Sequence, residues 1–179
     1  MDRRAPPVRD PAAAARSPCT GARENLLEIG VGSGRYALPV AARLGKRGRL
    51  DVLDLQEEML ALTMRRARAR SITNVVPARG DAAALPYPDG AFDAVYLVST
   101  LGQVPDMTAA LRELRRVLRR PGRVVIGEVC YDPHGVFFGT LRRRAAAAGL
   151  CFEARIGGWS GSSPASGQWS RDPAHYDRP

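Results

Sequence analysis

The chain has almost no lysine. Lys46 is the only lysine among 27 basic residues, and the formal net charge is +9. This preference for arginine, together with many alanines, is typical of a GC-rich genome, so the charge alone does not indicate a nucleic-acid partner. Aromatic residues are also few, at 6%. None of them interleaves with the arginines of residues 107–119, whereas single-stranded nucleic acids are bound by basic grooves lined with aromatic rings. We therefore expect no nucleic-acid partner.

Cysteines and long apolar runs are scarce as well. Cys19, Cys130 and Cys151 form no C-x-x-C pair, which is the spacing typical of metal and redox sites, so we expect no metal. No stretch approaches the roughly 20 apolar residues that a membrane-spanning helix needs. Residues 1–22 also contain no apolar segment long enough for a secretory signal. These absences predict a cytoplasmic protein without a membrane span, and they do not indicate its oligomeric state.

The length of 179 residues and a hydrophobic content of 45% are typical of one globular domain. Residues 1–22 are rich in Ala, Pro and Arg without periodicity, which predicts a flexible N-terminal arm. Residues 23–157 form the predicted domain, and residues 158–179 form an irregular tail. The predicted organisation is therefore one folded unit between two irregular ends.

An apolar stretch leads directly into alternating glycines at Gly30, Gly32 and Gly34. A chain that leaves a buried strand and turns into a helix beside a ligand needs residues that tolerate positive φ and carry no Cβ. The dinucleotide fingerprint G-x-G-x-x-G requires its third glycine one position later, where Arg35 stands. Glu28, two residues before the first glycine, disfavours a pyrophosphate and favours a ligand with an ammonium group. The run predicts a cradle for a cationic nucleotide.

Two further acidic residues follow predicted strands. Asp54 ends the next strand, about 20 residues after the last glycine, which is the offset at which an acidic residue binds ribose hydroxyls. Asp81 follows Gly80 after a third strand. Each has an ordinary alternative, because Asp54 can cap a helix and Asp81 can stabilise a turn. Glu28 can likewise be a strand-end charge, so the ordered set carries more weight than any single member.

Strand and helix patterns alternate along residues 25–156. This alternation predicts a Rossmann-like, doubly wound α/β fold, with a mostly parallel sheet and helices on both faces. The predicted strands are 25–30, 50–55, 75–79, 92–99, 123–129 and 151–156, and the predicted helices are 33–44, 57–70, 107–119 and 136–148. Because open α/β sheets bind ligands at the carboxyl ends of their strands, all of the motifs above are expected at one edge.

Together these motifs resemble the class I S-adenosylmethionine-dependent methyltransferases, especially the group that includes the quinone-biosynthesis enzymes. That group has E-x-G-x-G-x-G, a strand-end acid, G-D and L-P-F-x-D-x-x-F-D, and the last block reads LPYPDGAFD here. The resemblance covers about residues 25–157. It implies S-adenosyl-L-methionine as cofactor and a small-molecule methyl acceptor that the sequence does not identify.

The resemblance also implies roles for individual residues. The backbone of residues 30–34 and Glu28 would border the methionine part, Asp54 would bind the ribose, Leu55 would pack on the adenine, and Asp81 and Ala82 would contact its ring. The complete set of expected cofactor residues is Glu28, Gly30, Gly32, Gly34, Tyr36, Asp54, Leu55, Asp81, Ala82 and Ser99.

The acceptor site is less clear from the sequence. His134, Gln103 and Glu128 are candidates for catalysis because each lies at or after the carboxyl end of a predicted strand, at the same edge. His134 could accept a proton near neutral pH, but an ordinary surface-loop histidine is the favoured interpretation. Gln103 stands where many members of the family carry a histidine or an acid, so proton abstraction there is not expected.

The tail after Gly158 is polar and shows no strand-like alternation. We therefore expect the last antiparallel strand of the fold to be missing or altered. Two explanations remain open: a divergent, disordered tail, or a slip of the reading frame near Trp159. One codon choice for residues 160–167, shifted by one nucleotide, encodes the apolar strand LGFFASFG. The nucleotide sequence of the gene decides between them, since codons that yield no apolar strand in either other frame exclude the slip.

Three functions remain open at this point. The first is methyl transfer by in-line displacement, which needs alignment and desolvation more than covalent catalysis. The second is a degenerate, non-catalytic S-adenosylmethionine-binding protein, motivated by the altered ends of the domain. The third is an NAD-dependent enzyme, which Arg35 and Glu28 disfavour.

Overall fold

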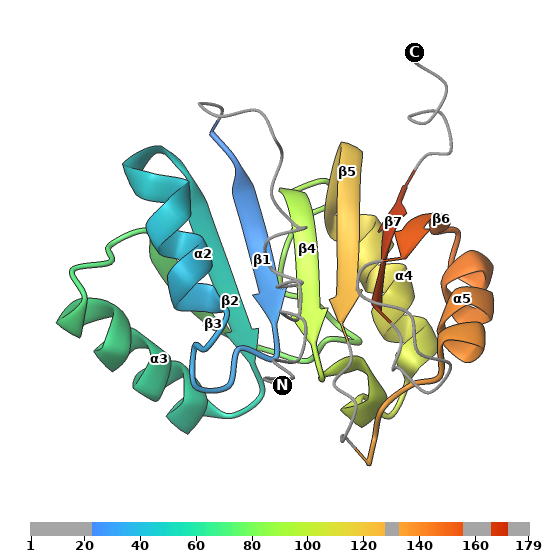
Figure 1. Ribbon diagram of the computed structural model, residues 1–179, viewed down its shortest axis with the longest axis horizontal. Coiled ribbons are helices and arrows are strands. Elements are labelled where there is room, and N and C mark those ends of the chain that lie inside the picture. Colours follow the sequence, from blue (N-terminus) through green and yellow to red (C-terminus); the bar gives the residue numbers. More distant parts are fainter. Residues whose placement is uncertain (1–22, 128–132, 156–165, 172–179) are drawn as a thin grey trace, which may run out of the picture.

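The computed structural model describes residues 23–127, 133–155 and 166–171. The described residues form one seven-stranded sheet with the order β3-β2-β1-β4-β5-β7-β6 (Figure 1). Strands β1 to β5 are parallel, and β7 is antiparallel to both β5 and β6. The strands are β1 (Asn25–Ile29), β2 (Arg49–Asp54), β3 (Val75–Arg79), β4 (Phe92–Val98), β5 (Leu118–Gly127), β6 (Cys151–Arg155) and β7 (Ser166–Ser170).

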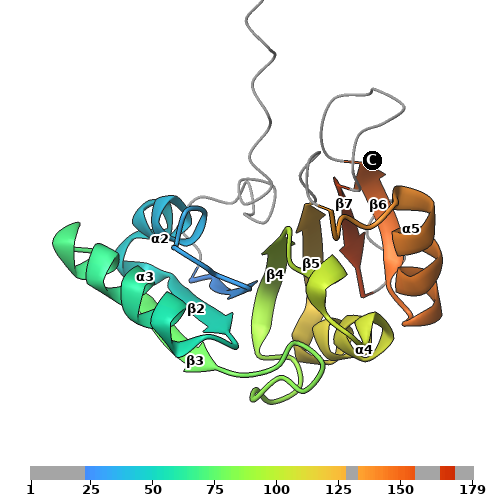
Figure 2. The ribbon, with the colours of Figure 1, turned by 90° about the horizontal axis from the view of Figure 1, so that it is seen from below.

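Helices cover both faces of the sheet, as expected. Two short 3-10 helices, η1 (Gly45–Arg47) and η2 (Leu101–Gln103), accompany the α-helices α2 (Ala37–Leu44), α3 (Glu57–Ala69), α4 (Met107–Val117) and α5 (Phe138–Ala147). Figure 2 separates α2 and α3, beside β1 to β3, from α4 and α5, beside β4 to β7. The predicted doubly wound α/β fold is confirmed.

Two hydrophobic clusters lie on the two faces of the sheet. The alternation of side chains along a strand sends Leu26 to one face and Leu27 to the other. Leu26 packs with Val40 of α2 and Leu60 of α3, whereas Leu27 belongs to the larger cluster with Leu111 of α4. A parallel sheet covered on both faces needs strands that are apolar at nearly every position, which explains why most residues of β1 and β4 are apolar.

Of the two alternatives expected for the last antiparallel strand, missing or altered, the first is wrong. β7 lies inside the predicted irregular tail, between β5 and β6, and its Trp169 is fully buried. A Cβ at Gly167 would lie only 2.7 Å from the Trp169 ring, so glycine leaves room for the indole of its own strand. Trp169 in turn meets the ring of Phe152 on β6 edge-on at 5.7 Å. In β7, Trp169 alone therefore makes the apolar contact with the core that several side chains usually make in a strand.

Two boundaries also differ from the prediction. α2 begins at Ala37 rather than at residue 33, because Gly34 has a φ of +76°, which no right-handed helix accommodates. β5 begins at Leu118 rather than at residue 123, because the chain becomes extended there and Leu118 pairs with Phe92. The predicted arm of residues 1–22 lies outside the described residues.

Candidate cofactor site

The glycine turn after β1 is held by packing at one position and is open at another. Gly30, Gly32 and Gly34 all have positive φ, at +72°, +51° and +76°. A Cβ at Gly30 would overlap the Thr100 side chain, which follows β4, whereas a Cβ at Gly32 would meet no atom within 4 Å. The turn is thus pressed against the protein at Gly30 and faces open space at Gly32.

Asp54 fastens this turn to the end of β2. Its Oδ2 atom accepts a hydrogen bond from the Gly32 N–H at 2.9 Å, and its Oδ1 atom accepts one from the Gln56 N–H at 3.0 Å. Each carboxylate oxygen has a further lone pair available for a ligand hydroxyl. Leu55, the next residue, is 61% exposed. The acid predicted to bind ribose therefore lies directly beside the glycine turn, together with an uncovered apolar side chain.

Helix α3 supports the turn from a second direction. The Thr63 hydroxyl donates to the Gly32 carbonyl at 3.0 Å, and the Arg66 guanidinium donates to the Ser33 carbonyl at 2.7 Å. Neither residue is foreseen by sequence reasoning, because each lies about thirty positions away from its partner along the chain. Their hydrogen bonds keep the backbone of the turn in place.

Glu28 is buried rather than open to solvent, with 2% of it exposed. It lies on β1 in register with Tyr96 of β4, and its Oε2 atom accepts a hydrogen bond from the Tyr96 hydroxyl at 2.7 Å. The structure therefore places the acidic residue of the motif in the sheet interior, close to the first turn residue. Tyr96 is a partner that the sequence motif does not reveal.

Ser99 combines two unusual features at the carboxyl end of β4. Its φ is +50°, a conformation that non-glycine residues rarely adopt and that costs about 1–3 kcal/mol. Its hydroxyl oxygen is buried and has no hydrogen-bond partner among the described residues. Backbone hydrogen bonds hold it there, since its N–H donates to the Gly127 carbonyl at 2.8 Å. A strained residue with an unpaired buried hydroxyl fits a ligand site.

The remaining expected cofactor residues lie around the same edge of the sheet. Asp81 is exposed, and its Oδ1 atom accepts from the Ala83 N–H at 2.8 Å, which is the turn-stabilising contact. Ala82 is buried in the larger hydrophobic cluster. Tyr36 packs against the cluster of α2 and α3, with the Arg35 guanidinium 5.7 Å from its ring.

The candidate catalytic residues are only partly described. Gln103 donates from its side-chain amide to the Ser99 carbonyl at 2.9 Å, so it supports the end of β4. His134 is exposed, and its backbone lies against η2, where a Cβ at Gly102 would overlap the His134 carbonyl. Glu128 lies outside the described residues. The structure therefore brings the His134 segment and η2 together at one edge.

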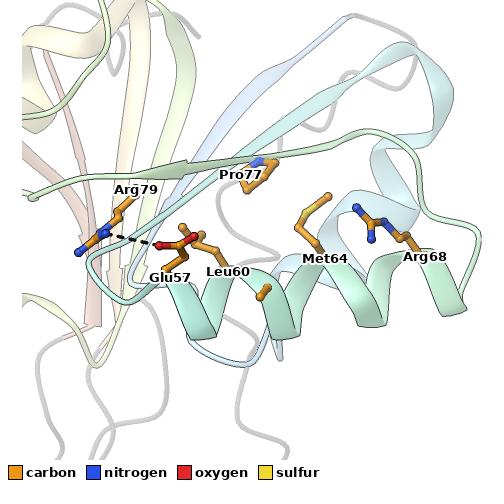
Figure 3. A pocket seen from close by; sticks show the side chains of 7 residues that line it. Glu57, Leu60, Met64, Arg68, Pro77 and Arg79 are labelled. Atoms are coloured by element: carbon orange, nitrogen blue, oxygen red, sulfur yellow. Dashed lines mark hydrogen bonds and ion pairs between the residues drawn. The ribbon is translucent and has the colours of Figure 1, made fainter.

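The groove in Figure 3 is separate from the glycine turn. Side chains of α3 and β3 line it, including Leu60, Met64 and Pro77. At one end Arg79 pairs with Glu57 at 3.5 Å and donates to the Leu55 carbonyl at 3.2 Å. The groove is thus linked to the Leu55 backbone through Arg79, and none of the three glycines of the turn lines it.

Within the described part of the chain, no helix is long and apolar enough to cross a membrane. The same part holds no group of three or more His, Cys, Asp or Glu side chains placed to bind a metal ion.

Residues 26–122, more than half of the chain, match the methyltransferase domain family. The chain belongs to this family. Among its relatives, the demethylmenaquinone methyltransferase of Shouchella clausii is 34% identical over 111 residues, which are 62% of this chain and 47% of that protein. This methyltransferase-domain chain therefore spans about half the length of the curated relatives it matches.

Solved structures agree with the fold. An S-adenosylmethionine-dependent methyltransferase of Aquifex aeolicus has a TM-score of 0.71 at 18% identity, with 82% of this chain and 81% of that chain covered. The [4+2]-cyclase SpnF has a TM-score of 0.64 at 28% identity, with 73% of this chain and 52% of that chain covered. The domain is that of the class I S-adenosylmethionine-dependent methyltransferases, with their Rossmann-like sheet.

Proposed function

We propose that this chain binds S-adenosylmethionine across its glycine turn and transfers the methyl group to a small-molecule acceptor. The observation that carries the proposal is the turn itself: open space at Gly32, the Asp54 carboxylate bonded to the Gly32 N–H, and a buried Ser99 hydroxyl that no described residue pairs with. An added Cβ at Gly32 would extend into the space that a ligand needs. The residues present therefore fit the cofactor that the family implies.

Each part of the cofactor has a partner in this arrangement. Asp54 binds the ribose hydroxyls, Leu55 covers one face of the adenine, and Asp81 with the Ala82 backbone contacts the adenine edge. Glu28 supplies negative charge near the ammonium group. When bound, S-adenosylmethionine supplies an electrophilic methyl group on a positively charged sulfur. The chain's contribution is to align that group with the acceptor and to exclude water, which lowers the barrier of an in-line displacement.

The relatives named demethylmenaquinone methyltransferases favour a quinone-related acceptor. On methylation a C–H or O–H acceptor would have to lose a proton, so the site would need a group that accepts it. His134 is the described candidate for accepting this proton, because it is exposed beside η2. Gln103 is unsuited to the task, since an amide is not a base.

The alternative of a non-catalytic binding protein loses one of its two supports, because β7 completes the sheet. Cofactor binding and turnover are therefore tested separately. Transfer of a labelled methyl group to a panel of reduced quinones supports the full proposal. Cofactor binding without transfer to any acceptor in a broad panel favours the alternative.

Calorimetric titration tests the cofactor. Wild-type protein is expected to bind S-adenosylmethionine and S-adenosylhomocysteine, and absence of binding at millimolar ligand refutes the proposal. Gly32→Ala is expected to weaken binding at least about tenfold, because its methyl group fills ligand space, whereas the positive φ costs only about 1–2 kcal/mol of stability. Gly139→Ala is the matched control. Gly139 lies in α5, where a Cβ meets no atom within 4 Å, so binding there should be unchanged.

A further inference from the structure

A buried tyrosine holds the acidic residue of the glycine motif. Tyr96 is fully buried and Glu28 is 2% exposed, and the 2.7 Å hydrogen bond from the Tyr96 hydroxyl to Glu28 Oε2 joins them. Hydrogen bonds to an ionised carboxylate are roughly twice as strong as those between neutral groups. A buried carboxylate that lost such a donor would lose part of what offsets its desolvation. The hydroxyl therefore holds the direction of the Glu28 carboxylate.

The two residues are also fixed relative to each other by the backbone. Glu28 pairs in register with Tyr96 on one side and with Val52 of β2 on the other, so β1 is held between two parallel strands. The Tyr96 ring packs in the cluster that contains Leu26 and Val125. Only side-chain rotation can move the Glu28 carboxylate, and a rigid ring with two torsions opposes that rotation.

The Glu28–Tyr96 pair lies next to the start of the glycine turn. Glu28 is two residues before Gly30. On β4, the chain continues from Tyr96 to Thr100, whose side chain occupies the space beside Gly30. Two residues of this stretch therefore contact the chain around the start of the turn: Tyr96 of β4 bonds Glu28, and Thr100, after β4, lies beside Gly30. Within a weakly polarisable interior, a fixed charge acts over several ångströms.

We propose that Tyr96 is a positioning residue that holds the Glu28 carboxylate in place for the ammonium group of the cofactor's amino-acid part. The inference rests on the proposed function, because it needs a ligand that carries an amino acid. It assigns Tyr96 to recognition of the amino-acid half and leaves the adenosine half to Asp54 and Leu55. The two halves can therefore be tested with different ligands.

The test compares two tyrosine variants and two ligands. Tyr96→Phe removes only the hydroxyl, and Tyr87→Phe is its matched control. The Tyr87 hydroxyl is also buried but has no hydrogen-bond partner among the described residues. S-Adenosylhomocysteine carries the amino-acid part, and 5′-methylthioadenosine lacks it. Tyr96→Phe is expected to weaken binding of S-adenosylhomocysteine about tenfold and to change that of 5′-methylthioadenosine less than about twofold. Tyr87→Phe should change neither by more than about twofold.

An equal loss for both ligands overturns the inference, because a merely structural role would disturb the whole site. Unchanged binding of both ligands overturns it as well. Failure of wild-type protein to bind either ligand instead refutes the proposed function, so the two failures are distinct. Calorimetry gives both dissociation constants, and the melting temperature of each variant is measured alongside.

Glu28→Gln provides the second variant, since an amide oxygen still accepts the Tyr96 hydrogen bond but carries no charge. It is expected to weaken binding of S-adenosylhomocysteine and not that of 5′-methylthioadenosine. In the Glu28→Gln background, Tyr96→Phe should add less than about twofold, because the two residues act through one interaction. Full additivity contradicts the inference. If Tyr96→Phe does not fold, Glu28→Gln alone decides, and an equal effect on both ligands refutes the proposal.

Discussion

At the scale of single residues, the glycines of the turn have different reasons to be glycine. Gly30 needs both a positive φ and the absence of a Cβ, because Thr100 fills the space beside it. Gly32 needs the positive φ and faces open space. A Cβ added at Gly34 would lie 2.9 Å from the Thr63 hydroxyl oxygen. The alternating pattern is the same at all three positions, so the sequence motif does not distinguish them.

Gly30→Ala is expected to destabilise the fold by about 2–4 kcal/mol. The left-handed conformation costs about 1–2 kcal/mol for an alanine, and displacing the Thr100 side chain adds an overpacking cost of similar size. Urea unfolding measures the loss. Gly139→Ala, in α5, should be neutral or slightly stabilising, because alanine favours helix where there is free space. Equal stability of the Gly30 and Gly139 variants would show that Thr100 adjusts without cost.

At the scale of the element, the large apolar side chain that anchors β7 in the core is Trp169 alone, rather than a row of alternate apolar residues. Gly167 and Trp169 are buried, Gln168 between them is half-buried, and the Gln168 amide donates to Glu153 of β6 at 2.6 Å. Backbone pairing with β5 and β6 gives this polar segment its extended form. A strand is predicted from the sequence when apolar residues occupy at least two alternate positions. β7 has one large apolar side chain, so this pattern does not detect it.

Trp169→Ala is expected to cost about 3–5 kcal/mol, the range for removing a large aromatic side chain from a core. Trp169→Phe should cost clearly less. It keeps an aromatic contact near Phe152 and removes an indole N–H that is buried without a partner among the described residues. Denaturant midpoints of the two variants provide the measurement. A wild-type midpoint for Trp169→Ala would mean that β7 contributes nothing to the core.

At the scale of the whole molecule, Arg116 of α4 joins elements that are distant in sequence. Its guanidinium donates to the Tyr87 carbonyl at 2.7 Å, to the Leu85 carbonyl at 3.0 Å and to Asp89 at 2.9 Å. Glu113, one turn earlier, accepts two hydrogen bonds from Arg116 and one from the Leu85 N–H. The segment after Asp81 is thereby fixed to the helix layer opposite α2 and α3.

This network predicts an acid-dependent loss of stability. The hydrogen bonds from Arg116 lower the pKa of Glu113 from its ordinary value of 4.5. A lowered pKa in the folded state contributes stability that is fully present above 4.5 and is lost as the pH falls below it, through the folded-state pKa. Arg116→Ala should reduce stability at pH 7 by about 2 kcal/mol and flatten this acid dependence. Unfolding curves between pH 3 and pH 7 measure both effects, with the exposed Arg112→Ala as control. An unchanged acid slope in Arg116→Ala would contradict the assignment.

The alternating α/β order, five parallel strands to within a few residues, and the positions of the glycine turn, Asp54 and Asp81 all follow from the sequence without the structure. These features are local: apolar runs, glycines and strand-end acids follow from conformational preference and burial within short segments. Tertiary structure alone decided that Tyr96 binds Glu28, that Thr63 and Arg66 hold the turn, and that Trp169 makes a strand of a polar segment. Each of those contacts joins residues that are far apart in the sequence and that meet only because of the strand order and the helix packing. No short segment of the sequence contains both partners, so none can predict the contact.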